Sequence, residues 1–211
     1  MACSRKVAFT TTVVSVLMLI LVPIHQIQGF PHGAPPQACG DMIPGHGVSA
    51  QQSTSPFMAI VSNMVAETGT PIMLELRPTD SRNNFKGYLV MAFDVNDNSQ
   101  PIGTFKQPNT GKLIDCGNGR MNAATHSDSS TKTSVTLEWI PPPNYSGQVK
   151  FRTTFVQNKV TFWVKTESET VSYATTGQTK QRFRVLQAQA QEGMALHRLL
   201  VSLQTWLPSR Y

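Results

Sequence analysis

Short hydrophobic runs alternate with clusters of turn residues through most of the 211-residue chain. Within several runs, hydrophobic and polar residues also alternate one by one, so that Val135, Leu137 and Trp139 fall on one face. A period of two residues is typical of a strand with one buried face. We expect strands at 57–65, 72–76, 86–94, 102–105, 112–116, 134–140, 149–156 and 160–165. About eight short strands with no helical period between them predict an antiparallel β-sandwich.

The segments on either side of this region have different patterns. Residues 30–56 are rich in Pro, Gly and Gln, which predicts an extended segment held against the domain rather than a helix. Residues 171–211 place leucines at helical spacing, which predicts a linker and then a basic amphipathic helix. Such a helix could bind a membrane surface or a partner, or it could be a packed helix or a tail with no role of its own. We favour a packed helix or a tail with no role of its own.

The first 29 residues carry the three parts of a secretory signal peptide. Arg5 and Lys6 form a basic start, residues 7–24 are uncharged and largely apolar, and a polar stretch ends in the small residue Gly29. An uncleaved membrane anchor is the alternative, because the uncharged stretch is at the lower limit of length for crossing a bilayer. We expect cleavage after Gly29, a secreted extracellular protein, and no stable membrane span after cleavage.

The net charge of +6 comes from the two ends of the chain, since residues 30–170 contain equal numbers of basic and acidic side chains. A nucleic-acid-binding domain concentrates positive charge on its own surface, so we expect no nucleic-acid partner. Nothing resembles a nucleophile elbow, and a metal site built from His32, Asp41 and His46 fits no known ligand spacing. We therefore expect no enzyme, no metal and no cofactor. His46 and His126 are expected to hold loops by hydrogen bonds.

Removal of the leader takes Cys3 away and leaves Cys39 and Cys116. Two cysteines in an oxidising compartment favour a disulfide, and two buried free thiols are the alternative. Their wide separation is not a zinc-binding signature. Asn144 begins an Asn-Tyr-Ser sequon in a Pro-rich turn, so a secreted chain is expected to carry a glycan there. An ordinary turn asparagine is the alternative.

A series of short motifs runs through the chain in a fixed order. It comprises Gly33-Ala34-Pro35, Ala38-Cys39, Met42-Ile43-Pro44-Gly45-His46-Gly47, Ser55-Pro56-Phe57, Phe85-Lys86-Gly87-Tyr88-Leu89-Val90, Ile102-Gly103-Thr104-Phe105, Asp115-Cys116, Thr125-His126-Ser127, Lys132, Trp139-Ile140-Pro141-Pro142-Pro143, Gly147-Gln148-Val149-Lys150-Phe151 and Phe162-Trp163-Val164. In order and spacing this series resembles the reeler domain. The chain is similar to the short insect defence proteins that consist of a signal peptide and one reeler domain.

The resemblance implies an immunoglobulin-like β-sandwich, secretion, and roles in antimicrobial defence and haemocyte nodule formation. It does not extend into the tail. The longer reeler proteins with a haem-bearing membrane redox domain are not matched, because no later transmembrane segment exists. We therefore divide the chain into a signal peptide (1–29), a reeler domain (30–170), and a linker with an amphipathic helical tail outside the domain (171–211).

Binding sites on β-sandwiches usually lie in the loops at their ends. The stretch 118–131 is long, polar and without a strand pattern, which suits a ligand with many hydroxyls or phosphates, such as a microbial glycolipid; a solvated loop is the alternative. The candidate ligand-binding residues are Arg120, Asn122, Thr125, His126, Ser127 and Lys132.

The leading hypothesis is a secreted innate-immune protein that binds microbial surface components, such as lipopolysaccharide or other glycoconjugates. It would act in the antibacterial response or in haemocyte nodulation. The alternative is an extracellular matrix or adhesion module with no antimicrobial role.

Overall fold

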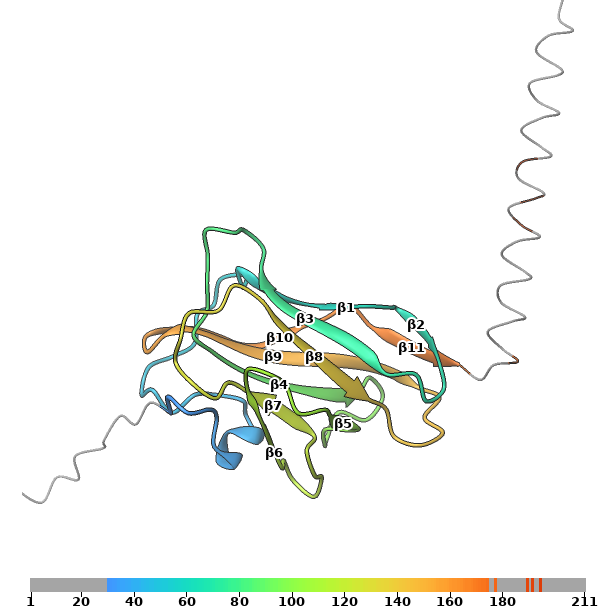
Figure 1. Cartoon of the computed structure of the whole chain (residues 1–211), viewed down its shortest axis with the longest axis horizontal. Coiled ribbons are helices and arrows are strands. Elements are labelled where there is room, and N and C mark those ends of the chain that lie inside the picture. Colours follow the sequence, from blue (N-terminus) through green and yellow to red (C-terminus); the bar gives the residue numbers. More distant parts are fainter. Residues whose placement is uncertain (1–29, 175–176, 178–188, 190, 192–193, 195–211) are drawn as a thin grey trace, which may run out of the picture.

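Two β-sheets packed face to face make up the structure, a computed structural model that describes residues 30–174 and the single residues 177, 189, 191 and 194 (Figure 1). Sheet A contains, in spatial order, β1 (Phe57–Val61), β3 (Ile72–Pro78), β8 (Val135–Ile140) and β5 (Thr104–Phe105). Sheet B contains β2 (Val65–Glu67), β11 (Val171–Ala174), β9 (Gln148–Asn158), β4 (Gly87–Asp94), β7 (Ala123–Thr125) and β6 (Lys112–Ile114), and β10 (Thr161–Glu167) pairs with β9. A 3-10 helix, η1 (Pro36–Cys39), precedes the strands.

The predicted β-sandwich is confirmed, with one difference in strand direction. Strand β11 pairs with β2 in parallel, with Ser172 opposite Val65. The remaining strand pairs among the described residues are antiparallel. Sheet B is therefore mixed rather than purely antiparallel.

The alternating sequence pattern places the core between the sheets. In β3, the side chains of Ile72, Leu74 and Leu76 are fully buried, whereas Met73 between them is 43% exposed. Strand β8 repeats the pattern, and its Trp139 is fully buried against the inter-sheet core. A side-chain period of two residues directs one face of each strand inward, so the pattern identifies the buried face correctly.

Strand β4 is buried on both faces, and this positions the candidate site. Its even-numbered side chains, from Tyr88 to Ala92, belong to the core between the sheets. The odd-numbered side chains, from Leu89 to Phe93, form a second cluster on the outer face of sheet B. That outer face is covered by residues 30–46, called the N-terminal segment below, which supply Ala38 and Met42 to the second cluster (blue in Figure 1).

A disulfide joins the N-terminal segment to sheet B. It links Cys39, in η1, to Cys116, two residues after β6, with the Cα atoms 5.5 Å apart. Cys116 is almost fully buried. The predicted pairing is therefore present, and it anchors the Pro- and Gly-rich segment over the outer face of β4.

Strands β2, β7 and β11 were not predicted. The predicted strand 57–65 ends at Val61 as β1 in sheet A, and β2 begins at Val65 in sheet B. Strand β7 lies within the stretch 118–131, which therefore is not a loop throughout as expected. Strand β11 continues sheet B to residue 174, with Val171 and Tyr173 buried. Strand β11 lies beyond the predicted domain end at residue 170, and its alternation of buried and half-buried residues is only four residues long.

The predicted signal peptide (1–29) and most of the predicted helical tail lie outside the described residues. In the part of the chain that the structure describes, no helix is both long and apolar enough to cross a bilayer.

Candidate functional site

A cavity of about 430 Å³ lies between the N-terminal segment and the outer face of sheet B. This volume is within the range typical of small-molecule sites, roughly 300–1,000 Å³. The N-terminal segment forms one wall, and β4, β9 and the residues that follow β7 and β9 form the other. Its lining residues are Phe30, Pro31, Ala34, Pro35, Ala38, Met42, Pro44, His46, Lys86, Gly87, Tyr88, Leu89, His126, Ser129, Thr154, Val156, Asn158 and Lys159.

The inner part of the cavity is apolar. Among its buried lining residues are Ala38, Met42 and Leu89, which also belong to the second hydrophobic cluster. The buried hydroxyl of Thr154 is already engaged, because it donates to the carbonyl of Met42 at 2.7 Å. The interior therefore offers apolar surface and few uncommitted hydrogen-bonding groups.

The mouth of the cavity is polar and positive. Lys86, Asn158 and Lys159 are exposed lining residues. Among the described residues, neither lysine ammonium has an ion-pair or hydrogen-bond partner, and none of the lining residues is Asp or Glu. The electrostatic field at the mouth thus favours an anionic group.

His46 is a buried lining residue with an uncommitted polar atom. Its side chain is 9% exposed and its ring packs edge-on against Phe162, with the ring centres 5.5 Å apart. The Nδ1 atom has no hydrogen-bond partner among the described residues. Burial lowers the pKa of His46, so the neutral ring is favoured at neutral pH. The prediction that His46 holds a loop by hydrogen bonding is not met at Nδ1.

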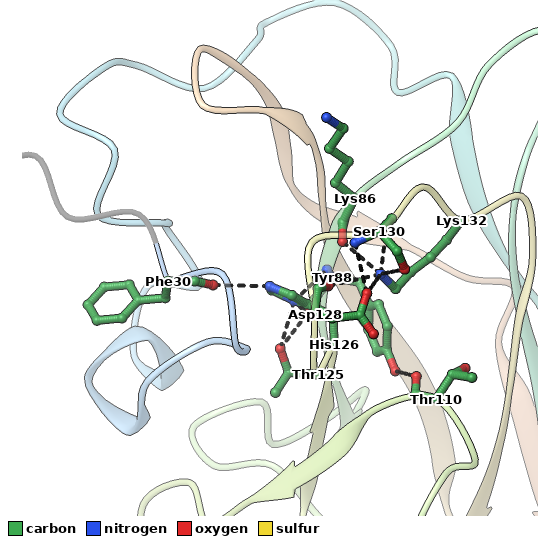
Figure 2. Close-up of polar contacts among 9 residues, drawn as sticks. All are labelled: Phe30, Lys86, Tyr88, Thr110, Thr125, His126, Asp128, Ser130 and Lys132. Carbon is green, nitrogen blue, oxygen red and sulfur yellow. Dashed lines mark hydrogen bonds and ion pairs between the residues drawn. The ribbon is translucent and has the colours of Figure 1, made fainter.

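His126 ties the start of the N-terminal segment to β4 (Figure 2). The backbone N–H of Tyr88 donates to Nδ1 at 3.2 Å, and Nε2 lies 3.2 Å from the carbonyl of Phe30. These partners fit the neutral tautomer with its proton on Nε2, which then donates to Phe30. Burial lowers the pKa of His126, against smaller opposing contributions from the hydrogen bonds to backbone. The predicted role in holding a loop is confirmed.

Thr125 makes a second attachment beside His126. Its hydroxyl donates to the carbonyl of Tyr88 at 2.6 Å and accepts from the backbone N–H of Ala34 at 3.0 Å. The side chain is fully buried. Thr125 is therefore a structural residue that joins β4, β7 and the N-terminal segment, and its hydroxyl is not free for a ligand.

Lys132 is also committed to the fold (Figure 2). Its side chain is 7% exposed, and its ammonium donates to the carbonyls of Lys86, Asp128 and Ser130 at 2.8–3.1 Å. The Asp128 carboxylate lies 3.2 Å away. Hydrogen bonds from Ser130, with a further one from Lys132, lower the pKa of that carboxyl. The ammonium thus closes the turn after β7 rather than facing a ligand.

The predicted ligand set is thus divided. The buried side chain of Asn122 brackets Cys116, accepting from its N–H at 2.8 Å and donating to its carbonyl at 2.9 Å. Arg120 is exposed and Ser127 is half-buried, and neither lines the cavity. Of the six predicted residues only His126 lines it, so the set is not brought together as one surface. Asn122, Thr125 and Lys132 are engaged in internal hydrogen bonds, and ligand binding by the predicted set stays a prediction.

The residues that sequence reasoning missed are the cavity's own: Met42, Lys86, Leu89 and Lys159. The sequence motif around Lys86 does not reveal that this residue lies beside a sheet face covered by the N-terminal segment. Asn144, the predicted glycosylation site, is exposed in the turn between β8 and β9 with a φ of 58°. Its glycosylation stays a prediction.

A family model for the reeler domain matches residues 37–179. This chain belongs to the reeler family. The matched range extends past residue 170, in agreement with the position of β11. Among solved structures, the reelin-N domain of F-spondin aligns with a TM-score of 0.50 at 18% identity, covering 66% of this chain and 95% of that one. The likeness concerns the fold alone.

Two curated relatives differ greatly in length. A Drosophila melanogaster protein named "Putative ferric-chelate reductase 1 homolog" is 34% identical over 78% of this chain, and the match spans only 26% of its own length. A Hyphantria cunea protein named "Putative defense protein Hdd11" is 31% identical over 72% of this chain and 93% of its own length. The chain therefore matches about a quarter of the longer relative and nearly the full length of the shorter one.

Within the described residues, no group of three or more His, Cys, Asp or Glu side chains is placed to hold a metal ion.

Proposed function

We propose that this reeler protein is secreted and acts in host defence by binding microbial surfaces, in the antibacterial response or in haemocyte nodulation. The observation that carries the proposal is that the match covers nearly the whole length of relatives named as defence proteins. The match spans 93% of the Hyphantria cunea protein and 95% of an Antheraea mylitta protein named "Putative defense protein 3", at 31% and 32% identity. For the longer reductase-named relative, the match spans only a minor part.

Secretion is supported by two features of the chain. Residues 1–29 have the pattern of a signal peptide. The two remaining cysteines form a disulfide, a bond that persists mainly in oxidising compartments. Expression in insect cells, followed by N-terminal sequencing of the protein in the medium, tests this directly. We expect a chain that begins at Phe30; a protein retained in the membrane fraction with its leader intact contradicts secretion.

A binding role, rather than catalysis, is supported by the cavity. It combines an apolar interior with a positive mouth, which suits recognition of a ligand with an apolar part and an acidic part. Outer surfaces of microbes are rich in anionic amphiphiles, so the chemistry of the cavity agrees with the defence-related names of the relatives.

The proposed function is tested by cosedimentation of the mature protein with whole Gram-negative bacteria, Gram-positive bacteria and yeast. We expect saturable binding to at least one of the three, and loss of that binding after reduction of the disulfide. A parallel measurement follows the protein in haemolymph after bacterial challenge, where a defence protein rises. Absence of binding to all three, with no rise after challenge, contradicts the proposal and favours a matrix or adhesion module.

A further inference from the structure

We propose that the cavity under the N-terminal segment holds a single acyl chain, with a compact anionic headgroup of the same molecule at Lys86 and Lys159. This inference deepens the proposed function, since it names the ligand class and the site, and it rests on that function only for the microbial origin of the ligand. Three properties of the cavity carry it: an apolar interior, a mouth with cations and no carboxylate, and an uncommitted buried histidine.

The interior suits a hydrocarbon chain better than a sugar. A buried sugar hydroxyl loses affinity unless it finds a hydrogen-bond partner. Apart from His46, the buried polar side chain of the cavity wall is already satisfied, because the hydroxyl of Thr154 donates to the carbonyl of Met42. An acyl chain needs no such partner, and each methylene removed from water strengthens binding about fourfold.

The mouth supplies the preference for an anion. Lys86 directly precedes β4, and Lys159 lies in the turn between β9 and β10. The two cations therefore approach the mouth from different elements. In Figure 2 the side chain of Lys86 extends away from the His126 network, while its carbonyl accepts from Lys132. Its ammonium is thus separate from the hydrogen bonds that hold the fold together and is available to a headgroup.

His46 favours a ligand that has a polar group within reach of its ring. The ring is 9% exposed and lines the cavity, and its Nδ1 atom has no hydrogen-bond partner among the described residues. A buried polar atom left without a partner is costly, and a hydroxyl or amide of the ligand would satisfy it once a rotation of the ring turns Nδ1 toward the cavity. His46 therefore discriminates against a pure hydrocarbon and in favour of an amphiphile.

The binding test uses the mature protein and defined single-chain lipids below their aggregation concentration, followed by isothermal titration calorimetry. The probes are palmitate and 1-palmitoyl-lysophosphatidylglycerol as anions, and 1-palmitoylglycerol as the neutral match. We expect one molecule bound per chain, with both anions at least about tenfold tighter than the neutral lipid, the equivalent of one charge-assisted contact. Equal affinity for all three lipids, or no binding, overturns the proposal.

Two variants assign the binding to the cavity. Val156→Phe places a ring in the cavity from the outer face of β9, and we expect loss of binding to palmitate. Lys86→Gln with Lys159→Gln should weaken the two anions about tenfold and leave the neutral lipid unchanged. The matched control, Lys106→Gln with Lys165→Gln, removes the same charge from two exposed residues outside the lining. If this control weakens binding equally, the preference arises from net charge and the assigned site is wrong.

A measurement on the unmodified protein covers the case in which a variant misfolds. A palmitate analogue with a photoreactive diazirine at its chain end is bound and irradiated, and the labelled peptides are identified by mass spectrometry. We expect label on residues 34–46, 86–89 or 154–156. Label confined to the exposed apolar residues Met64, Val65 and Met73 would place the lipid elsewhere and overturn the proposal.

The two proposals fail separately. If bacteria are bound equally by the wild type and by the Val156→Phe variant, the cavity is not the recognition site and the defence role stands. If the lipids bind in the cavity but the protein binds no microbe and is not induced, the site stands and the defence role falls.

Discussion

Replacement of both bridged cysteines by alanine should destabilise the domain severely and release the N-terminal segment. The disulfide joins residues 77 positions apart in the sequence. For a loop of that length, the chain-entropy relation gives about 4.5 kcal/mol of stabilisation at 25 °C. Both sulfurs also contact the second hydrophobic cluster, where Cys116 is 1% exposed. Alanine keeps these positions apolar, so the loss reports the crosslink more than a new buried polar group.

The assay is urea unfolding of the Cys39→Ala/Cys116→Ala variant and of the wild type, with and without reductant, followed by tryptophan fluorescence. We expect the free energy of unfolding to fall by about 3–5 kcal/mol in the variant, and the reduced wild type to behave in the same way. Hydrogen exchange locates the effect: the amide of Ala34, which donates to Thr125, should lose protection first. A loss below about 1 kcal/mol, with protection of Ala34 retained, would show that packing and hydrogen bonds alone hold the N-terminal segment in place.

Three further outcomes follow from the same region. Acidification should destabilise the domain, because burial lowers the pKa of both His46 and His126. The stability that the two neutral rings contribute is present above their ordinary pKa near 6.5 and is lost as the pH falls through their folded-state pKa values. The urea midpoint should therefore drop between pH 7.5 and 5, and His126→Gln should flatten this pH dependence. Lys132→Met should cost about 2 kcal/mol, since it removes a buried ammonium that donates to three backbone carbonyls; a change below about 0.5 kcal/mol in urea unfolding would contradict the role assigned to this ammonium. Gly33→Ala should lower the free energy of unfolding by about 1–3 kcal/mol and weaken palmitate binding. Gly33 has a φ of +102°, and an added Cβ would collide with the carbonyl of His126. Unchanged unfolding and unchanged binding would refute this.

Much of the fold could be predicted from local patterns. Strands β3 and β8 alternate over five or more residues with large apolar side chains, and β4 is an unbroken apolar run, as expected of a strand buried on both faces. Strand β7 is hard to predict because its residues 123–125 are Ala, Ala and Thr, of which only Thr125 has a side chain typical of strands. Their burial comes from neighbours on both sides, which the local sequence does not reveal.

The candidate site was harder to predict, because polar residues in this region have two different roles. Thr125 and Lys132 resemble surface residues in the sequence, yet both are buried and hydrogen-bonded to backbone groups far away along the chain. Lys86 and Lys159 face the same cavity only because β4 and β9 pair, with Gly87 opposite Val156. The cavity itself exists because the Pro-rich segment crosses the outer face of β4, a choice of face that composition does not specify.

The most direct test of the account is competition between a soluble lipid and whole bacteria for the wild-type protein. The protein is first bound to cells, then 1-palmitoyl-lysophosphatidylglycerol or its neutral match 1-palmitoylglycerol is added below its aggregation concentration, and the protein left on the cells is measured. If the cavity recognises an acyl anion of the microbial surface, the anionic lipid releases the protein at the concentration that saturates the cavity, and the neutral lipid releases little. Protein that stays on the cells while its cavity is filled by the lipid would contradict the account.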